Sequence, residues 1–225
     1  MNRKTTLLGG AIAAAVLLAP GVSGATMLLD TGIPNLNGPA ASLSTVSWSA
    51  AEFVAQAGED VTSLSAYVTA GDGKGKPGDS FTFDIYSASS FIGVRTGQLG
   101  TPLATATATY ENDGWTTAAV NWITPGAAGT SADYWVALEV SSTSMTNGLD
   151  LPEETSNLTG TVPAAGFATL SSGKFTTSGA LPIGIEVTAT SPVPLPPAAW
   201  LFGSGLFGLG LLRRRKPVEN WGAAA

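Results

Sequence analysis

The sequence predicts an all-β fold: a single β-sandwich, jelly-roll-like, flanked by an N-terminal signal helix and a C-terminal transmembrane helix. Three observations predict this fold. Gly, Ser, Thr, Ala and Asx residues dominate the region from 26 to 190. Short runs of alternating apolar and polar residues recur there, and Gly/Pro/Asp clusters typical of turns separate them. Each end of the chain instead carries an uninterrupted apolar run beside positive charges.

Three segments have the clearest alternation, with a period of two. Their apolar rows are Phe81/Phe83/Ile85, Tyr134/Val136/Leu138/Val140 and Ile183/Ile185/Val187. Such a row lies on one face of a strand, so these strands are expected to be half-buried against a second sheet. Segments 101–110 and 115–122 flank Glu111-Asn112-Asp113-Gly114, a turn signal that predicts a hairpin between them.

The N-terminal region, 1–25, is predicted to be a secretory signal peptide. Arg3-Lys4 is a positive start, residues 7–18 are apolar, and Ser23-Gly24-Ala25 is a small-residue cleavage site. Cleavage is expected between Ala25 and Thr26. An uncleaved N-terminal anchor is the alternative.

The C-terminal region, 191–216, combines a proline hinge, an apolar stretch and a basic cluster. Residues 193–212 carry no charge, close to the roughly 20 residues that span a bilayer, but the stretch free of proline is shorter. Four basic residues follow, and the positive-inside rule keeps them in the cytoplasm. Residues 217–225 form a short tail. The pattern indicates a processed span, and an ordinary tail anchor is the alternative.

This C-terminal pattern resembles the PEP-CTERM sorting signal of Gram-negative bacteria. The sorting motif comprises Val193, Pro194, Leu195, Pro196, Pro197, Ala198, Ala199 and Trp200, and the basic stop comprises Arg213, Arg214, Arg215 and Lys216. Leu195 stands where that family often has glutamate, and nine residues follow the stop. The resemblance implies processing by exosortase, a membrane-embedded transpeptidase-like protease, after export by the secretion machinery.

The middle region, 26–190, resembles the choice-of-anchor domains, most closely type R. The resemblance depends on Phe53–Gln56, Leu64–Val68, Ser80–Tyr86, Ala132–Leu138 and Leu181–Ile185. It implies a secreted β-sandwich of undefined activity.

The chain contains no cysteine and no histidine, which excludes thiol chemistry, His-ligated metals and Ser-His-Asp triads. A carboxylate pair, as in glycoside hydrolysis, is the enzymatic route left open. Its candidates are Asp84, Glu111, Asp113 and Glu139. Asp84 and Glu139 are expected on outer faces in contact with solvent, so we predict that the chain is not an enzyme.

The region 26–190 is acidic, with fifteen Asp or Glu against four Lys or Arg, a balance of −11. Such a surface repels nucleic acid and anionic lipid headgroups, so we expect no nucleic-acid partner.

No metal site is predicted, although calcium stays open as a cofactor because loops of secreted sandwiches often supply oxygen ligands. The candidates are Asp72, Asp79, Asn112 and Asp113. None follows an EF-hand spacing, and turn formation explains their positions equally well.

The expected role is that of an exported protein held transiently in the inner membrane and then released to the cell surface or extracellular matrix. A structural, adhesive or polysaccharide-associated function fits this destination. Trp115, beside a turn, is the aromatic residue most expected to contact sugar. The alternatives are a secreted carbohydrate-binding or carboxylate-dependent polysaccharide-active protein, and a permanently tail-anchored periplasmic binding domain.

Overall fold

The computed structural model describes residues 24–44, 46–71, 75–89, 99–140, 148–153, 160–171, 174–178 and 183–191. All of them lie in one compact unit, Ser23–Pro192. The signal sequence up to residue 23, the sorting motif, the basic stop and the tail lie outside the described residues. Among the residues that are described, no helix is long and apolar enough to span a membrane.

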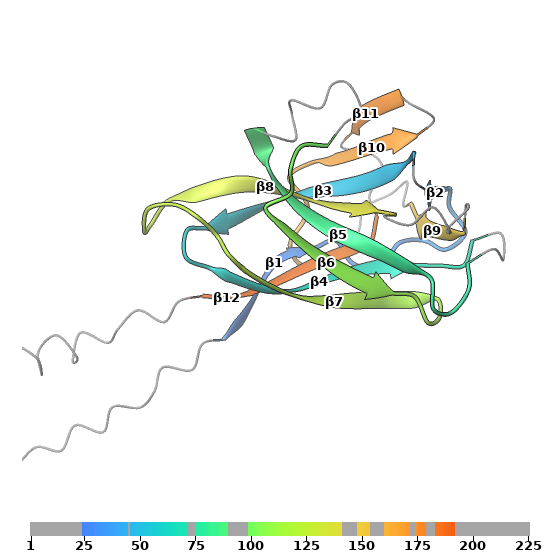
Figure 1. Cartoon of the computed structure of the whole chain (residues 1–225), viewed down its shortest axis with the longest axis horizontal. Coiled ribbons are helices and arrows are strands. Elements are labelled where there is room, and N and C mark those ends of the chain that lie inside the picture. Colours follow the sequence, from blue (N-terminus) through green and yellow to red (C-terminus); the bar gives the residue numbers. More distant parts are fainter. Residues whose placement is uncertain are drawn as a thin grey trace, which may run out of the picture. The chain divides into compact units, whose positions relative to one another are not determined.

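The described part of the chain is built from β-strands, which confirms the predicted all-β class (Figure 1). The strands are β1 (Ala25–Asp30), β2 (Ala40–Leu43), β3 (Trp48–Gln56), β4 (Asp60–Val68), β5 (Ser80–Ser87), β6 (Ala104–Thr109), β7 (Gly114–Ile123), β8 (Ser131–Glu139), β9 (Leu149–Pro152), β10 (Phe167–Ser171), β11 (Lys174–Ser178) and β12 (Ile185–Thr190).

These strands form two large antiparallel sheets in a sandwich-like arrangement. One sheet has the order β1-β12-β4-β7, and the other has the order β11-β10-β3-β8-β5-β6. The strands β2 and β9 form a separate two-stranded ladder. Below, the large sheets are called the four-stranded and the six-stranded sheet.

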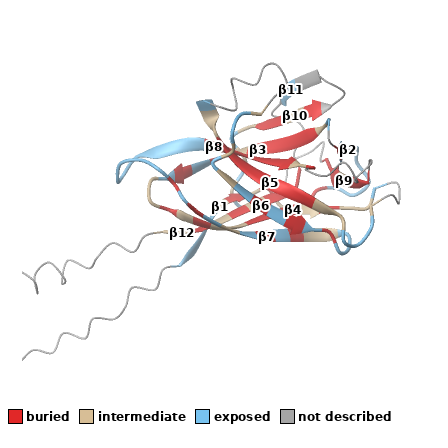
Figure 2. Ribbon diagram, viewed as in Figure 1, coloured by how far each residue is buried: buried red, intermediate tan, exposed pale blue. Residues whose placement is uncertain are grey.

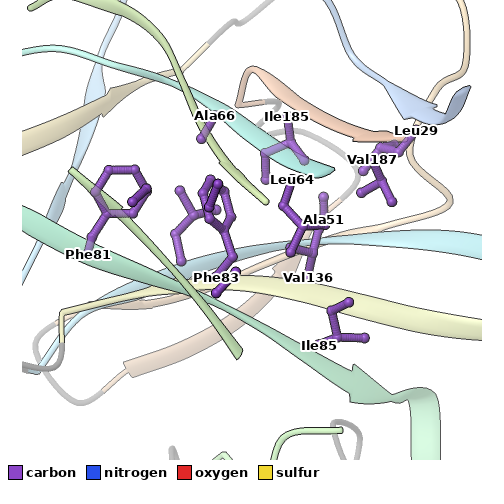
Figure 3. Packing of buried hydrophobic residues seen from close by; sticks show 14 of the residues in the cluster. Leu29, Ala51, Leu64, Ala66, Phe81, Phe83, Ile85, Val136, Ile185 and Val187 are labelled. Atoms are coloured by element: carbon purple, nitrogen blue, oxygen red, sulfur yellow. The ribbon is translucent and has the colours of Figure 1, made fainter. Parts of the chain in front are cut away.

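The main core lies between the two large sheets. Every residue of the three predicted apolar rows belongs to it. Figure 3 shows Phe83 of β5 in one cluster with Leu64 of β4 and Ile185 of β12, which belong to the other sheet. Trp122 of β7 and Tyr134 of β8 meet edge to face, with ring centroids 4.9 Å apart, and so join the two sheets. Burial of this apolar area is the main force that holds the sheets together.

The predicted hairpin between segments 101–110 and 115–122 is wrong. β6 pairs with β5, whereas β7 pairs with β4, so the turn carries the chain from one sheet to the other. Both arms bury one row in the core, including Ala106 of β6 and Ala118 of β7. The two arms therefore belong to different sheets on opposite sides of the core. The turn sequence between two strands does not determine which strands pair with each other.

The first and last strands of the sandwich are neighbours. β1 pairs with β12, and Ala25 lies opposite Thr190. The start of β1 and the end of β12 therefore lie side by side at one end of the four-stranded sheet (Figure 1).

Candidate functional site

Each large sheet carries a cross-strand Tyr–Trp pair and a glutamate on its outer face. In the six-stranded sheet Tyr86 lies opposite Trp135, and Glu139 is on the same strand as Trp135. In the four-stranded sheet Tyr67 lies opposite Trp115. Glu186 is on neighbouring β12, with its flanking residues Ile185 and Val187 in the core. The two faces hold similar side chains in different surroundings.

The middle of the outer face of the six-stranded sheet is buried, and we call this part the covered face. The margins of the same face, which include Val54, Thr107 and Asp133, are exposed. The covered face consists of a second apolar cluster: Trp48, Ala50, Tyr86, Trp135, Ala137, Ala168 and Leu170. Ala88 and Leu99, which belong to the connection between β5 and β6, pack against this cluster. Figure 2 shows β3 and β5 coloured as buried over much of their length. The prediction that β8 is half-buried is therefore wrong, because Trp135 and Ala137 are buried as well.

Polar groups on the covered face bond to one another. The Thr82 hydroxyl donates to Asp84 Oδ2 at 2.9 Å, and the Thr105 hydroxyl donates to Asp84 Oδ1. The Tyr86 hydroxyl donates to Glu139 Oε1 at 2.7 Å. Burial raises the pKa of the Glu139 carboxyl, the hydrogen bond from Tyr86 lowers it, and the charge of Asp84 raises it further, so the net shift is upward.

Two of the four candidate carboxylates, Asp84 and Glu139, thus come together. Asp84 lies opposite Ala137, so Glu139 is its diagonal neighbour, roughly 7–8 Å away. The expectation that both face solvent is wrong for Asp84, which is only 7% exposed. Both carboxylates already accept hydrogen bonds inside the protein, an arrangement that ties β5, β6 and β8 together.

The other two carboxylate candidates lie elsewhere. Glu111 is exposed in the turn between β6 and β7. Asp113 Oδ1 accepts hydrogen bonds from the Tyr110 hydroxyl at 2.6 Å and from the Ala70 backbone N–H at 2.7 Å. Asp113 therefore holds the turn to the end of β4, and neither residue joins the pair on the covered face.

The calcium candidates do not form a cluster in the described part of the chain, where no three acidic residues come together. Asp79 Oδ2 accepts the Lys76 backbone N–H at 2.8 Å, so this carboxylate is used within its own loop. Asn112 is exposed, and Asp72 lies outside the described residues.

The outer face of the four-stranded sheet is partly exposed, and we call it the open face. It consists of Ser63, Ser65, Tyr67, Trp115, Thr117, Ala119, Glu186 and Thr188. These residues point outward because Leu64, Ala66 and Val187, which alternate with them, are fully buried in the core. Small hydroxyl side chains make up half of these residues, and they lie beside the two aromatic rings.

Trp115 and Tyr67 pack edge to face on the open face, with ring centroids 5.7 Å apart and an interplanar angle of 80°. Both rings are partly exposed, so Trp115 is less exposed than its place beside a turn predicts. Gly184 continues this row across the sheet, since the Tyr67 N–H donates to its carbonyl. A Cβ at Gly184 would lie 2.7 Å from Tyr67 Cβ and 2.8 Å from Pro34 Cδ. The glycine therefore lets Pro34 and Tyr67 approach each other.

Glu186 lies between Asp30 and Ser65 in the next row of the open face. Asp30 is fully engaged, because its carboxylate accepts hydrogen bonds from Gly32 and from both the N–H and the hydroxyl of Thr161. Burial raises the pKa of Asp30, but these hydrogen bonds lower it, and the net shift is downward. Burial and then the charge of Asp30 raise the pKa of Glu186.

The pairing of Tyr67 with Trp115 was not anticipated, nor were the roles of Gly184 and Glu186. The alternation of Ser63, Ser65 and Tyr67 with Leu64 and Ala66 contains the signal that Tyr67 points outward. No local signal states that β7 pairs with β4, so the sequence could not bring Trp115 to Tyr67.

The junction of the sandwich with the predicted processing segments is also visible. Ala25 and Thr26, the predicted cleavage positions, are the exposed first residues of β1. At the other end Ser191 Oγ donates to Glu59 Oε1 at 3.4 Å. Glu59 is itself held by the Gln56 N–H, at 2.8 Å from Oε2. Ser191 is therefore attached to the sandwich through Glu59.

No family model matches this chain, and no curated protein matches it.

Proposed function

We propose that this chain is an exported surface or extracellular-matrix protein of a Gram-negative bacterium, sorted and processed by exosortase. The observation that carries the proposal is the order of the C-terminal sequence: Val193 to Pro197 as hinge, an uncharged apolar stretch, and Arg213 to Lys216 as basic stop. A charged stop after a marginal span holds a protein in the inner membrane with its domain outside. The Pro hinge then exposes a cleavable segment between domain and membrane.

In this proposal the chain is a substrate and not an enzyme. The secretion machinery exports it, the C-terminal helix anchors it transiently, and exosortase supplies the catalytic groups. The released domain has a structural, adhesive or polysaccharide-associated role. The rival role of a carboxylate-dependent enzyme gains little from Asp84 and Glu139, because both lie on the covered face.

The structure of the domain supports processing at both ends. The chain before Thr26 contributes one exposed residue, Ala25, to the sandwich, and the last strand ends at Thr190. Cleavage after residue 25 and again beyond Pro192 therefore leaves the core residues of both sheets in place. A domain that loses both membrane segments without losing core contacts can be released in folded form.

We further propose a jelly roll as the finer description of the fold. The strand order supports it: β1, β3, β4, β5, β6, β7, β8 and β12 form two four-stranded layers, β1-β12-β4-β7 and β3-β8-β5-β6. This is the order produced when a long antiparallel ribbon wraps into two Greek keys. The β10–β11 hairpin then extends one layer at the β3 edge.

The test is intact mass and terminal peptide mapping of the protein from its native host, with membrane and extracellular fractions measured separately. The expected product is extracellular, begins at Thr26 and ends within or near the hinge. Deletion of the host exosortase should shift the protein to the membrane fraction with Arg213–Lys216 still attached. A protein that keeps Trp200 through Lys216 in the membrane fraction of the unmodified host would refute sorting and support a tail-anchored binding domain.

A further inference from the structure

We propose that the open face binds an uncharged polysaccharide, whose sugar rings stack on the Tyr67–Trp115 pair while Glu186 accepts their hydroxyl groups. This inference rests on the proposed function, because it names the ligand that the released domain would meet in the extracellular matrix. It depends on four features of the face, which are the aromatic pair, the hydroxyl row, the carboxylate and the charge of the domain.

The aromatic pair is the stacking surface. Trp115 and Tyr67 are partly exposed and meet edge to face, so at least one ring turns its π-face away from the other. The electron-rich π-face attracts groups with a positive edge, and the C–H groups on the flat side of a pyranose ring are of this kind. The equivalent pair on the other sheet, Tyr86 and Trp135, is 2% and 5% exposed and is closed to such a ligand.

The hydroxyl row lies beside the aromatic pair. Thr117 follows Trp115 by two residues, and Ser65 precedes Tyr67 by two, so the rows are roughly 7 Å apart along the strands. The Ser65 and Thr117 hydroxyls are 2.9 Å apart, and one donates to the other. Ser65 is only 6% exposed, whereas Thr117 is exposed, so Thr117 is the member of this pair whose hydroxyl can bond a sugar. Their small size leaves space above the sheet next to the rings.

Glu186 extends this hydroxyl row, because it lies opposite Ser65 in the β12–β4 ladder. An ionised carboxylate only accepts hydrogen bonds and has two oxygens, so it can receive two neighbouring hydroxyls of one sugar. Asp30, its partner on β1, already accepts hydrogen bonds from Gly32 and Thr161. Glu186 is thus the carboxylate on this face that is suited to a ligand.

The charge of the domain selects the class of polysaccharide. The region 26–190 has a balance of −11, so anionic glycans are repelled. The length of the surface favours a polymer over a single sugar. Pro34 adjoins Tyr67 across Gly184, and Ile33 and Leu36 of the same loop are 57% and 56% exposed. A chain of several sugar rings can therefore continue from the aromatic pair toward this loop.

The experiment is affinity electrophoresis of the full chain in detergent, through gels that contain dextran, hydroxyethylcellulose, galactomannan or the anionic control alginate. At least one uncharged polymer should retard the protein, and alginate should retard it less. Trp115→Ala and Tyr67→Ala should each weaken binding about tenfold, which corresponds to about 1.4 kcal/mol. Glu186→Gln should weaken it several-fold, while Tyr67→Phe, which keeps the ring, should bind nearly as well as the original chain.

The matched control is Asp133→Asn, an exposed carboxylate on the outer side of the six-stranded sheet, which should leave binding unchanged. Thermal unfolding of every variant separates lost binding from lost fold. Equal retardation of the original chain, Trp115→Ala and Tyr67→Ala would overturn the inference. The absence of retardation by any uncharged polymer would also overturn it. A third contrary result would be that the chain is a dimer and that Trp115→Ala makes it a monomer, because the open face would then bind a second copy.

The sorting proposal is judged separately by release from the membrane. Normal exosortase-dependent release together with no glycan binding would overturn the open-face inference alone. Glycan binding by a protein that keeps its basic stop in the native host would overturn the sorting proposal alone.

Discussion

The covered face and the open face show how one set of side chains acquires two roles. Each face has a Tyr opposite a Trp in neighbouring strands, and each has a glutamate within the same sheet. On the covered face Ala50, Ala137 and Ala168 surround the indoles and join an apolar cluster. On the open face the corresponding small residues are serines and threonines, and no second apolar cluster forms there among the described residues.

The difference teaches that the small residues around an aromatic pair, more than the pair itself, decide its burial. Alanine side chains leave an apolar surface whose burial is favourable, so Ala88 and Leu99 can pack on it. Covering a surface of serine and threonine side chains would bury their hydroxyl groups, and this costs free energy unless the hydroxyls form new hydrogen bonds. The hydroxyl-rich face therefore stays partly accessible, although Ser65, which is hydrogen-bonded to Thr117, is buried.

The largest expected difference comes from deleting the two indoles. Trp135→Ala should lower the free energy of unfolding by about 3–5 kcal/mol, because the side chain is only 5% exposed and a cavity remains. Trp115→Ala should cost about 1 kcal/mol, as expected for a partly exposed residue. Urea unfolding at one pH measures both. Equal losses of stability in the two variants would show that Trp135 and Trp115 are buried to the same extent.

A smaller difference is expected from removing the two phenol hydroxyls. Tyr86→Phe takes away the donor 2.7 Å from Glu139 Oε1, and loss of a hydrogen bond to a charged group costs about 1.5–3 kcal/mol. Tyr67→Phe on the open face should change stability by less than about 0.5 kcal/mol. The same urea titration applies, and a large loss for Tyr67→Phe would show a buried partner on the open face.

The smallest effect is a change in the pH dependence of stability. The pKa of Glu139 is raised above its ordinary 4.5, so just above pH 4.5 the folded state binds more protons than the unfolded state. Its contribution to stability is therefore present below pH 4.5 and is lost as the pH rises through the folded pKa. Glu139→Gln should flatten this decline while keeping an acceptor for Tyr86.

Glu186→Gln is the matched variant on the open face. The pKa of Glu186 is also raised, but that carboxyl is less buried, so the flattening should be weaker. Thermal unfolding at a series of pH values from 4 to 8 measures both variants. A steeper decline in Glu139→Gln than in the original chain would contradict the assigned direction.

The inward rows were predictable from the sequence because they obey a local rule. Phe81, Phe83 and Ile85 alternate with polar residues, and the same period marks Ile185 and Val187. The partner of each strand was not predictable in this way. The turn at 111–114 predicted a hairpin, whereas β6 and β7 pair with β5 and β4 in different sheets. Strand partners are set by the whole core and not by the turn between two arms.

The candidate site shows the same limit. Asp84 and Glu139 were correctly assigned to outer faces, but Asp84 is not in contact with solvent as expected. Its carboxylate accepts a hydrogen bond from Thr105, and this contact follows only from the pairing of β5 with β6. Trp115 was identified as a sugar contact from its place beside a turn, and its neighbour Tyr67 follows only from the β4–β7 register.

The position of β12 bears on how a tethered domain would withstand mechanical load. β12 carries Glu186 near one end and finishes at Thr190, immediately before the segment that we propose attaches the precursor to the membrane. It is hydrogen-bonded on one side to β1 and on the other to β4. A mechanical force between a ligand bound on the open face and the membrane tether would therefore act along β12. This strand is hydrogen-bonded to a neighbouring strand on each side. The force would reach the membrane without straining the contacts between the sheets.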